Sequence, residues 1–140
     1  MSLAPLLNAP TTIVIHAAAA MIALGIGAVQ LAAPKGTLPH RTLGWVWALT
    51  MTVVAVSSFW IHTICTFGPF SAIHGLSLFT LAVLPLAVLH ARRHRVARHR
   101  RAMLFLFAGA LMVAGLFTLL PGRIMHDVVF GTTAAHRTCS

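Results

Sequence analysis

Long apolar runs separated by short polar breaks are the main pattern along the chain. Read in windows of about 20 residues, the length that crosses about 30 Å of hydrocarbon, the runs cover residues 12–33, 42–65, 71–91 and 102–121. None of the four contains an Asp, Glu, Lys or Arg. Because apolar residues fill each run instead of recurring every three to four positions, most of each helix surface must face lipid. The sequence therefore predicts four membrane-spanning helices.

The breaks between the runs carry residues that end helices. Pro34 and Gly36 follow the first run, Gly68 and Pro69 follow the second, and an arginine-rich segment separates the third from the fourth. Four helices with short connections predict an up-down-up-down antiparallel bundle. The fold class is therefore all-α, a polytopic membrane protein whose single domain spans residues 1–140.

The composition excludes an ordinary soluble domain. Of the 140 residues, 59% are hydrophobic and only 8% are charged, and the only acid is Asp127. A soluble domain needs roughly 25% charged residues to keep its surface in water. A lipid bilayer is therefore the expected solvent for most of this surface.

The basic residues are distributed unevenly between the predicted connections. Lys and Arg collect on the cytoplasmic side of short loops, so this bias places both basic connections in the cytoplasm and both termini outside. The expected location is the inner membrane of a bacterium, with anionic headgroups beside the arginines and no role in nucleic-acid binding. Eight of the ten basic residues lie in the first and third connections: Lys35, Arg41, Arg92, Arg93, Arg95, Arg98, Arg100 and Arg101.

Histidines recur at matching places in the two halves of the chain. An Ile-His pair opens the first and third runs at His16 and His74, and a His-Arg pair precedes the second and fourth at His40 and His99. The two histidines of each half are 24 and 25 residues apart. This spacing indicates a duplicated helical hairpin, with the two halves related by an axis along the membrane normal.

The duplication predicts two layers of paired imidazoles. His16 and His74 would share a depth near the outer surface, and His40 and His99 would share one near the inner surface. Diagonal helices of a bundle stand roughly 11–14 Å apart, which leaves room for two imidazoles and a metal between them. Two bis-histidine layers are the ligand arrangement of b-type haem, so the sequence predicts one or two haems b held by these four metal ligands.

Three arginines are suitable partners for haem propionates. Arg41 and Arg100 adjoin the inner pair, and Arg123 lies on the outer side. Guanidinium groups bind carboxylates through charge-assisted hydrogen bonds. We therefore expect a membrane electron-transfer protein that exchanges electrons with a quinone or another redox partner, and no enzymatic role beyond that of an electron-transfer component.

Other interpretations of the same residues stay open. The histidines can instead form hydrogen bonds between helices in a small accessory subunit of a larger membrane complex, or in a homo-oligomer. A metal or solute transporter is a third possibility, with Ser57, Ser58, Gln30 and Thr80 as path-lining candidates. Cys65 and Cys139 fall on the outer side, where they either form a disulfide or remain separate thiols.

The order of the histidine motifs resembles one known family. "IH", "HR", "SSFWIH", "FSAIHGLSL", "HRRAM" and "LPGR" follow one another over roughly residues 12–131. This series is similar to that of DUF2306, an uncharacterised bacterial family whose name denotes a domain of unknown function. The resemblance implies a four-helix integral membrane protein and no particular activity. The layout is also similar to that of four-helix b-type cytochromes, which is an analogy of architecture.

Overall fold

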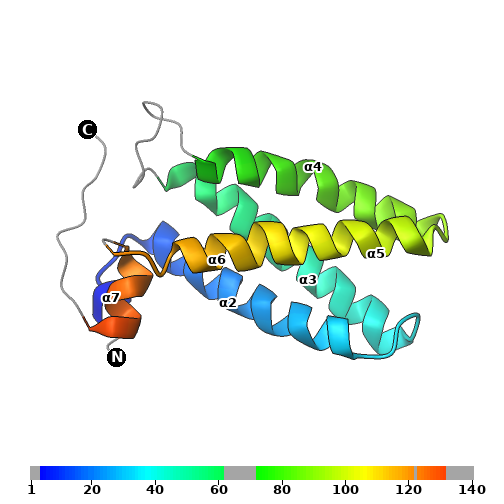
Figure 1. Cartoon of the computed structure of the whole chain (residues 1–140), viewed down its shortest axis with the longest axis horizontal. Coiled ribbons are helices and arrows are strands. Elements are labelled where there is room, and N and C mark those ends of the chain that lie inside the picture. Colours follow the sequence, from blue (N-terminus) through cyan, green and yellow to red (C-terminus); the bar gives the residue numbers. More distant parts are fainter. Residues whose placement is uncertain (1–3, 62–71, 122, 132–140) are drawn as a thin grey trace.

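The computed structural model describes residues 4–61, 72–121 and 123–131 (Figure 1). Within these ranges all regular structure is helical. In chain order the elements are α1 (Ala4–Leu7), α2 (Thr11–Ala32), α3 (Leu38–Ser57), the 3-10 helix η1 (Ser58–Trp60), α4 (Ala72–Arg92), α5 (Val96–Phe105), the π-helix η2 (Leu106–Val113), α6 (Ala114–Phe117) and α7 (Ile124–Phe130).

Four helical stretches are long and apolar enough to cross a membrane. They are Thr11–Ala32, Leu38–Trp60, Ile73–Arg92 and Val96–Phe117. Between 11% and 33% of the most apolar window of each is buried inside the chain, so most of their apolar side chains point outward. Outward-facing apolar side chains of this extent require lipid as the surrounding solvent. The prediction of an all-α protein with four apolar spans is confirmed.

Two of the predicted helix starts are wrong by several residues. The second span begins at Leu38 instead of residue 42, because Thr37 caps the helix by accepting a hydrogen bond from the backbone N–H of His40 at 3.3 Å. The fourth begins at Val96 instead of residue 102. Arginine has a good helix propensity and the first turns lie outside the apolar window, so a hydrophobicity criterion cannot detect them.

The fourth run is shorter in the structure than predicted, and the end of the second lies outside the described residues. The fourth span ends at Phe117, four residues before the predicted end at 121, in a turn closed by the Thr118 hydroxyl on the Gly115 carbonyl. The second run was expected to reach Cys65, which lies outside the described residues, as does Cys139. The two alternatives for these cysteines, a disulfide or separate thiols, therefore both stay open.

The four long helices form two adjacent hairpins. In Figure 1 the connections at residues 33–37 and 93–95 lie at one end of the molecule, and α1 and α7 lie together at the other end. We call the end with the two connections the basic end. Helix α2 packs on α3, α3 on α4, α4 on α5, and η2 closes the ring against α2. Helices α2 and α4 are therefore diagonal, and so are α3 and the α5–η2 helix.

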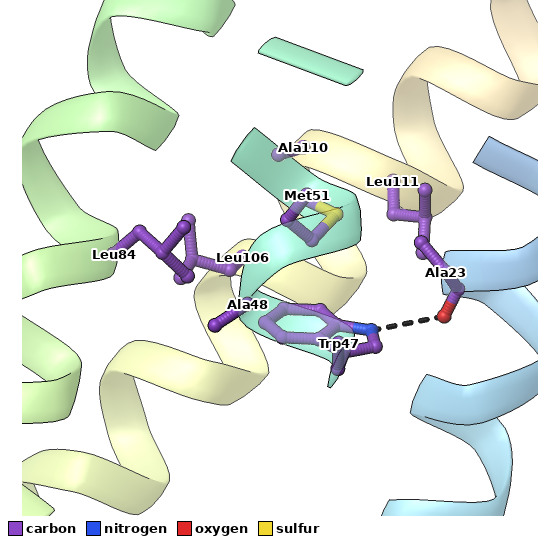
Figure 2. Packing of buried hydrophobic residues seen from close by; sticks show 8 residues of the cluster. All are labelled: Ala23, Trp47, Ala48, Met51, Leu84, Leu106, Ala110 and Leu111. Carbon is purple, nitrogen blue, oxygen red and sulfur yellow. Dashed lines mark hydrogen bonds between the residues drawn. The ribbon is translucent and has the colours of Figure 1, made fainter. Parts of the chain in front are cut away.

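The core lies at the centre of this ring (Figure 2). The side chains of Trp47, Met51 and Leu106 are at most 2% exposed. The indole N–H of Trp47 donates to the backbone carbonyl of Ala23 at 2.9 Å, which links α3 to α2 through a polar contact in an otherwise apolar centre. A tryptophan is well suited to such a site because its ring is apolar while its N–H can satisfy a partner.

Gly27 allows the closest approach of the helices around this core. A Cβ atom at this position would lie 2.6 Å from the Phe107 ring on η2 and 2.8 Å from Nε1 of Trp47 on α3. Small residues at helix contacts let backbones approach in membrane proteins, where dispersion contacts replace the hydrophobic effect as the source of association. The rotation of α2 about its axis is therefore set by this glycine and the two aromatic rings against it.

Candidate functional site

His16 is held by a serine of the neighbouring helix. Its Nδ1 lies 3.0 Å from the hydroxyl oxygen of Ser57 on α3. The Ser57 hydroxyl donates its own hydrogen to the Val53 carbonyl at 2.7 Å, so its oxygen is left as an acceptor toward the imidazole. Nδ1 of His16 therefore carries the hydrogen, and in the neutral ring Nε2 presents a lone pair.

His74 lies near the start of α4 and is buried. Its ring centroid is 5.8 Å from that of Phe59 on η1, with an angle of 58° between the ring planes. Ser57 and Phe59 are two residues apart in the chain. The two outer histidines of the predicted pair therefore approach the same end of α3 and η1, His16 from α2 and His74 from α4.

A buried group of hydroxyls surrounds this end of α3. Ser58 hydrogen-bonds to Ser77 of α4, which links η1 to α4 through side chains. Ser77 also donates to the Ile73 carbonyl, and Thr80 donates to the Leu76 carbonyl. These hydroxyls and His74 account for all the buried polar side chains of the described residues except Asp127. They are Ser57, Ser58, His74, Ser77 and Thr80.

Sequence reasoning missed Ser77 as a member of this group. Ser77 lies three residues after His74 on α4, so the two side chains share a helix face. That spacing was a usable signal. A serine in a membrane helix, however, commonly bonds to the carbonyl one turn before it, as Ser77 does with Ile73, and this local bond makes the residue inconspicuous in the sequence.

The inner histidines occupy equivalent places in the two hairpins. Nδ1 of His99 on α5 lies 2.9 Å from the carbonyl oxygen of Ala87 on α4. Because a carbonyl can only accept a hydrogen bond, Nδ1 carries the hydrogen. The backbone carbonyl of His40 on α3 accepts a hydrogen bond of 2.9 Å from the side-chain amide of Gln30 on α2. Each of these two histidines therefore bonds to the preceding helix of its own hairpin.

The ring of His40 is not satisfied by the chain. His40 on α3 and His99 on α5 belong to diagonal helices, and both lie near the basic end. The Nδ1 atom of His40 is buried and has no hydrogen-bond partner. An unpaired buried nitrogen costs on the order of 1–3 kcal/mol, so this ring is held in a position that its own chain does not satisfy.

A metal ion bound by protein side chains alone needs several ligands in one place. Within the described ranges, no group of three or more His, Cys, Asp or Glu side chains could hold a metal ion. A haem would need only two imidazoles from the chain, because its porphyrin supplies the other ligands of the iron.

The three predicted arginines differ in position. Arg41 and Arg100 are exposed at the basic end, next to His40 and His99 in the chain. Arg123 is half-buried and precedes α7, at the opposite end of the bundle. Asp127 of α7 is 1% exposed, and its Oδ1 lies 3.6 Å from Nδ1 of His126. The only carboxylate side chain is thus remote from the inner histidines.

A groove of about 510 Å³ opens on the outside of the bundle between α2 and α3. It shares Ser57 with the His16 hydrogen bond, and Val53, Val56 and Trp60 form exposed parts of its wall. The sequence could not reveal this groove, because it depends on which faces of the two helices meet. The lining residues are Thr12, Ile15, Thr52, Val53, Val56, Ser57 and Trp60.

Comparison with known proteins agrees with the fold and says nothing about chemistry. No curated protein and no solved structure is significantly similar to the chain. One family model matches residues 13–139, nearly the whole length, and it is described as a predicted membrane protein. The four apolar spans of the structure agree with that description. The chain therefore belongs to the family Predicted membrane protein (DUF2306), a domain of unknown function.

Proposed function

We propose that this protein is a b-type-cytochrome-like electron carrier that binds haem b noncovalently between pairs of histidines. The observation that carries the proposal is the environment of His40 and His99. The ring of His40 has a buried nitrogen without a partner, and the ring of His99 has its Nδ1–H bonded to the Ala87 carbonyl. Metal-binding histidines characteristically donate their second ring N–H to a carbonyl or similar acceptor.

The outer pair supports a second haem of the same kind. His16 also donates from Nδ1, in this case to Ser57, which leaves Nε2 as the nitrogen with the lone pair. His74 belongs to the diagonal helix and approaches the same end of α3. Two haems, one toward each end of the bundle, would give electrons a route across the membrane.

The arginines would balance the charge of the bound group. Haem propionates are anionic and must leave the hydrocarbon, so they need cationic partners near a membrane surface. Arg41 and Arg100 are exposed beside the inner pair, and Arg123 lies at the other end. Haem, when bound, would supply one-electron redox chemistry, while the chain would orient the imidazoles.

The redox partner we propose is a lipid-soluble quinone. The long helices expose most of their apolar surface, so a partner dissolved in the bilayer can reach the bundle from the side. By the distribution of Lys and Arg, we place the basic end in the cytoplasm and both termini outside the inner membrane of a bacterium.

An absorption spectrum tests the haem proposal. The full chain, purified in mild detergent from haem-replete cells, should show a Soret band, and its reduced form should show split α and β bands. His99→Ala should remove the inner haem and His16→Ala the outer one. His94→Ala is the matched control, because His94 is exposed in the turn between α4 and α5. A colourless, stably folded protein would overturn the proposal.

A cofactor-free accessory subunit of a larger membrane complex is the second candidate. It is favoured by the bonds of His16 to Ser57 and of His99 to Ala87, because each one links neighbouring helices as a purely structural histidine does. Purification of the tagged protein in mild detergent separates the two proposals. A colourless protein that co-purifies with a larger complex supports the subunit, whereas a coloured protein that runs alone supports the carrier.

A further inference from the structure

The basic end carries a large charge that the chain itself does not balance. Eight of the ten Lys and Arg residues lie there, and all eight side chains are exposed. The only acidic side chain of the whole chain, Asp127, is buried in α7 at the opposite end. The counter-charge for these cations must therefore come from outside the protein.

One of these arginines is held in a defined position. The guanidinium carbon of Arg92, the last residue of α4, lies 6.0 Å from the ring centroid of Trp45 on α3. Such a cation–π contact uses the face of the guanidinium plane and leaves its N–H donors free to bind an anion. The Trp45 side chain is 52% exposed, so the contact is on the outer surface of the bundle.

A second arginine lies on the same face of α3. Arg41 precedes Trp45 by four residues in the helix, and residues at this spacing are neighbours on a helix surface. Arg41 is exposed, as is Arg92. Both arginines are therefore close to the exposed Trp45 side chain where α3 meets α4, Arg92 through its cation–π contact and Arg41 through its place one turn earlier on α3.

Arg41, Trp45 and Arg92 lie at a depth that matches the boundary of the membrane. Trp45 lies seven residues, or about 10 Å, inside the start of the span Leu38–Trp60, and Arg92 ends the span Ile73–Arg92. Tryptophan rings and arginine side chains concentrate where hydrocarbon meets the headgroups. An anion that reaches the guanidinium groups of Arg41 and Arg92 from the bilayer must therefore be one that resides at the boundary between hydrocarbon and headgroups.

We propose that Arg41, Trp45 and Arg92 form a binding site for the phosphodiester group of an anionic phospholipid. The guanidinium groups of Arg41 and Arg92 donate to the phosphate oxygens, and the Trp45 ring orients Arg92 and packs beside the upper part of the acyl chains. A zwitterionic lipid binds less well, because its ammonium group is repelled by the excess of arginine at this end. This inference does not rest on haem binding, and it assigns Arg41 to a lipid phosphate, which leaves Arg100 as the propionate partner beside the inner pair.

Native mass spectrometry of the full chain in mild detergent tests the site. The probes are phosphatidylglycerol and phosphatidylcholine with identical acyl chains. Arg92→Gln should weaken the first bound phosphatidylglycerol by about tenfold, since a charge-assisted hydrogen bond is lost. Arg95→Gln removes the same charge from the same end, but Arg95 lies in the turn beyond α4. The affinity of this variant for phosphatidylglycerol should stay within about twofold of the wild type.

Two further measurements separate a built site from general attraction. Arg92→Lys keeps the charge but loses the planar fork, so it should bind phosphatidylglycerol more weakly than the wild type and more tightly than Arg92→Gln. Soluble glycerol phosphate should compete poorly, because it lacks the acyl chains. Equal losses in Arg92→Gln and Arg95→Gln would overturn the proposal, as would equal binding of the two lipids or full competition by glycerol phosphate.

Discussion

Nδ1 of His16 on α2 lies 3.0 Å from the hydroxyl oxygen of Ser57 on α3, 41 residues further along the chain. Because the Ser57 hydroxyl gives its hydrogen to the Val53 carbonyl, the imidazole must be the donor in this contact. Ser57 thus makes Nδ1 the nitrogen of His16 that carries the hydrogen, and the backbone of Val54 is a further hydrogen-bond partner of the ring. The same rule applies to His99, where the acceptor is the Ala87 carbonyl.

Ser57→Ala should destabilise the protein by about 1 kcal/mol, because the N–H of His16 loses its acceptor at a partly buried position. If haem is bound, the affinity of the outer pair, His16 and His74, for haem should also fall about tenfold. Removing a residue that orients a metal ligand has an effect of this size. Thermal unfolding in detergent and haem titration measure the two effects. Thr50→Ala is the control, since the hydroxyl of the half-buried Thr50 donates to the Val46 carbonyl within its own helix.

Gly27→Ala should destabilise the bundle by about 1–3 kcal/mol, because the added Cβ would overlap Phe107 and Trp47. Gly25→Ala, two residues away on the same helix, meets nothing within 4 Å and should be neutral or slightly stabilising through its better helix propensity. Unfolding midpoints of the two variants in the same detergent give the comparison. Equal midpoints would show that α2 does not approach η2 as closely as described.

Trp47→Phe should cost about 1–3 kcal/mol of unfolding free energy, because it leaves a void at the centre of the core and removes the N–H bond to Ala23. The same change at Trp60, whose side chain is 66% exposed, should have little effect. Tryptophan fluorescence gives a second readout, since Trp47 is 2% exposed whereas Trp45 and Trp60 are 52% and 66% exposed. A Trp47→Phe protein as stable as the wild type would contradict this assignment of the core.

His94 has a left-handed backbone conformation, with φ of 53°, in the turn between α4 and α5. His94→Gly should be neutral or stabilising, because glycine adopts positive φ without steric cost. His94→Val should destabilise the hairpin by about 1–2 kcal/mol, since a β-branched side chain is disfavoured there. Arg95→Val, at φ of −84°, is the matched control and should change the unfolding midpoint less.

The sequence alone determined the four spans and the asymmetric distribution of charge. Both are local properties: a run of about 20 apolar residues must satisfy its backbone internally in lipid, and a helix is the simple way to do so. The starts of the second and fourth helices were wrong because the Thr37 cap and the helical arginines after Val96 lie outside any apolar window. The duplication of the hairpin stays a prediction, since His99 bonds through its ring whereas His40 bonds through its backbone carbonyl.

Only the tertiary structure decided what each histidine meets. In a membrane bundle the lipid-facing side of a helix is as apolar as the side facing the core, so the sequence contains no amphipathic signal that fixes how each helix is rotated. The rotation follows from packing, such as Gly27 against Trp47 and Phe107. That packing brings Ser57 to His16, which no spacing in the sequence indicates, because two residues 41 positions apart become neighbours only when their helices pack.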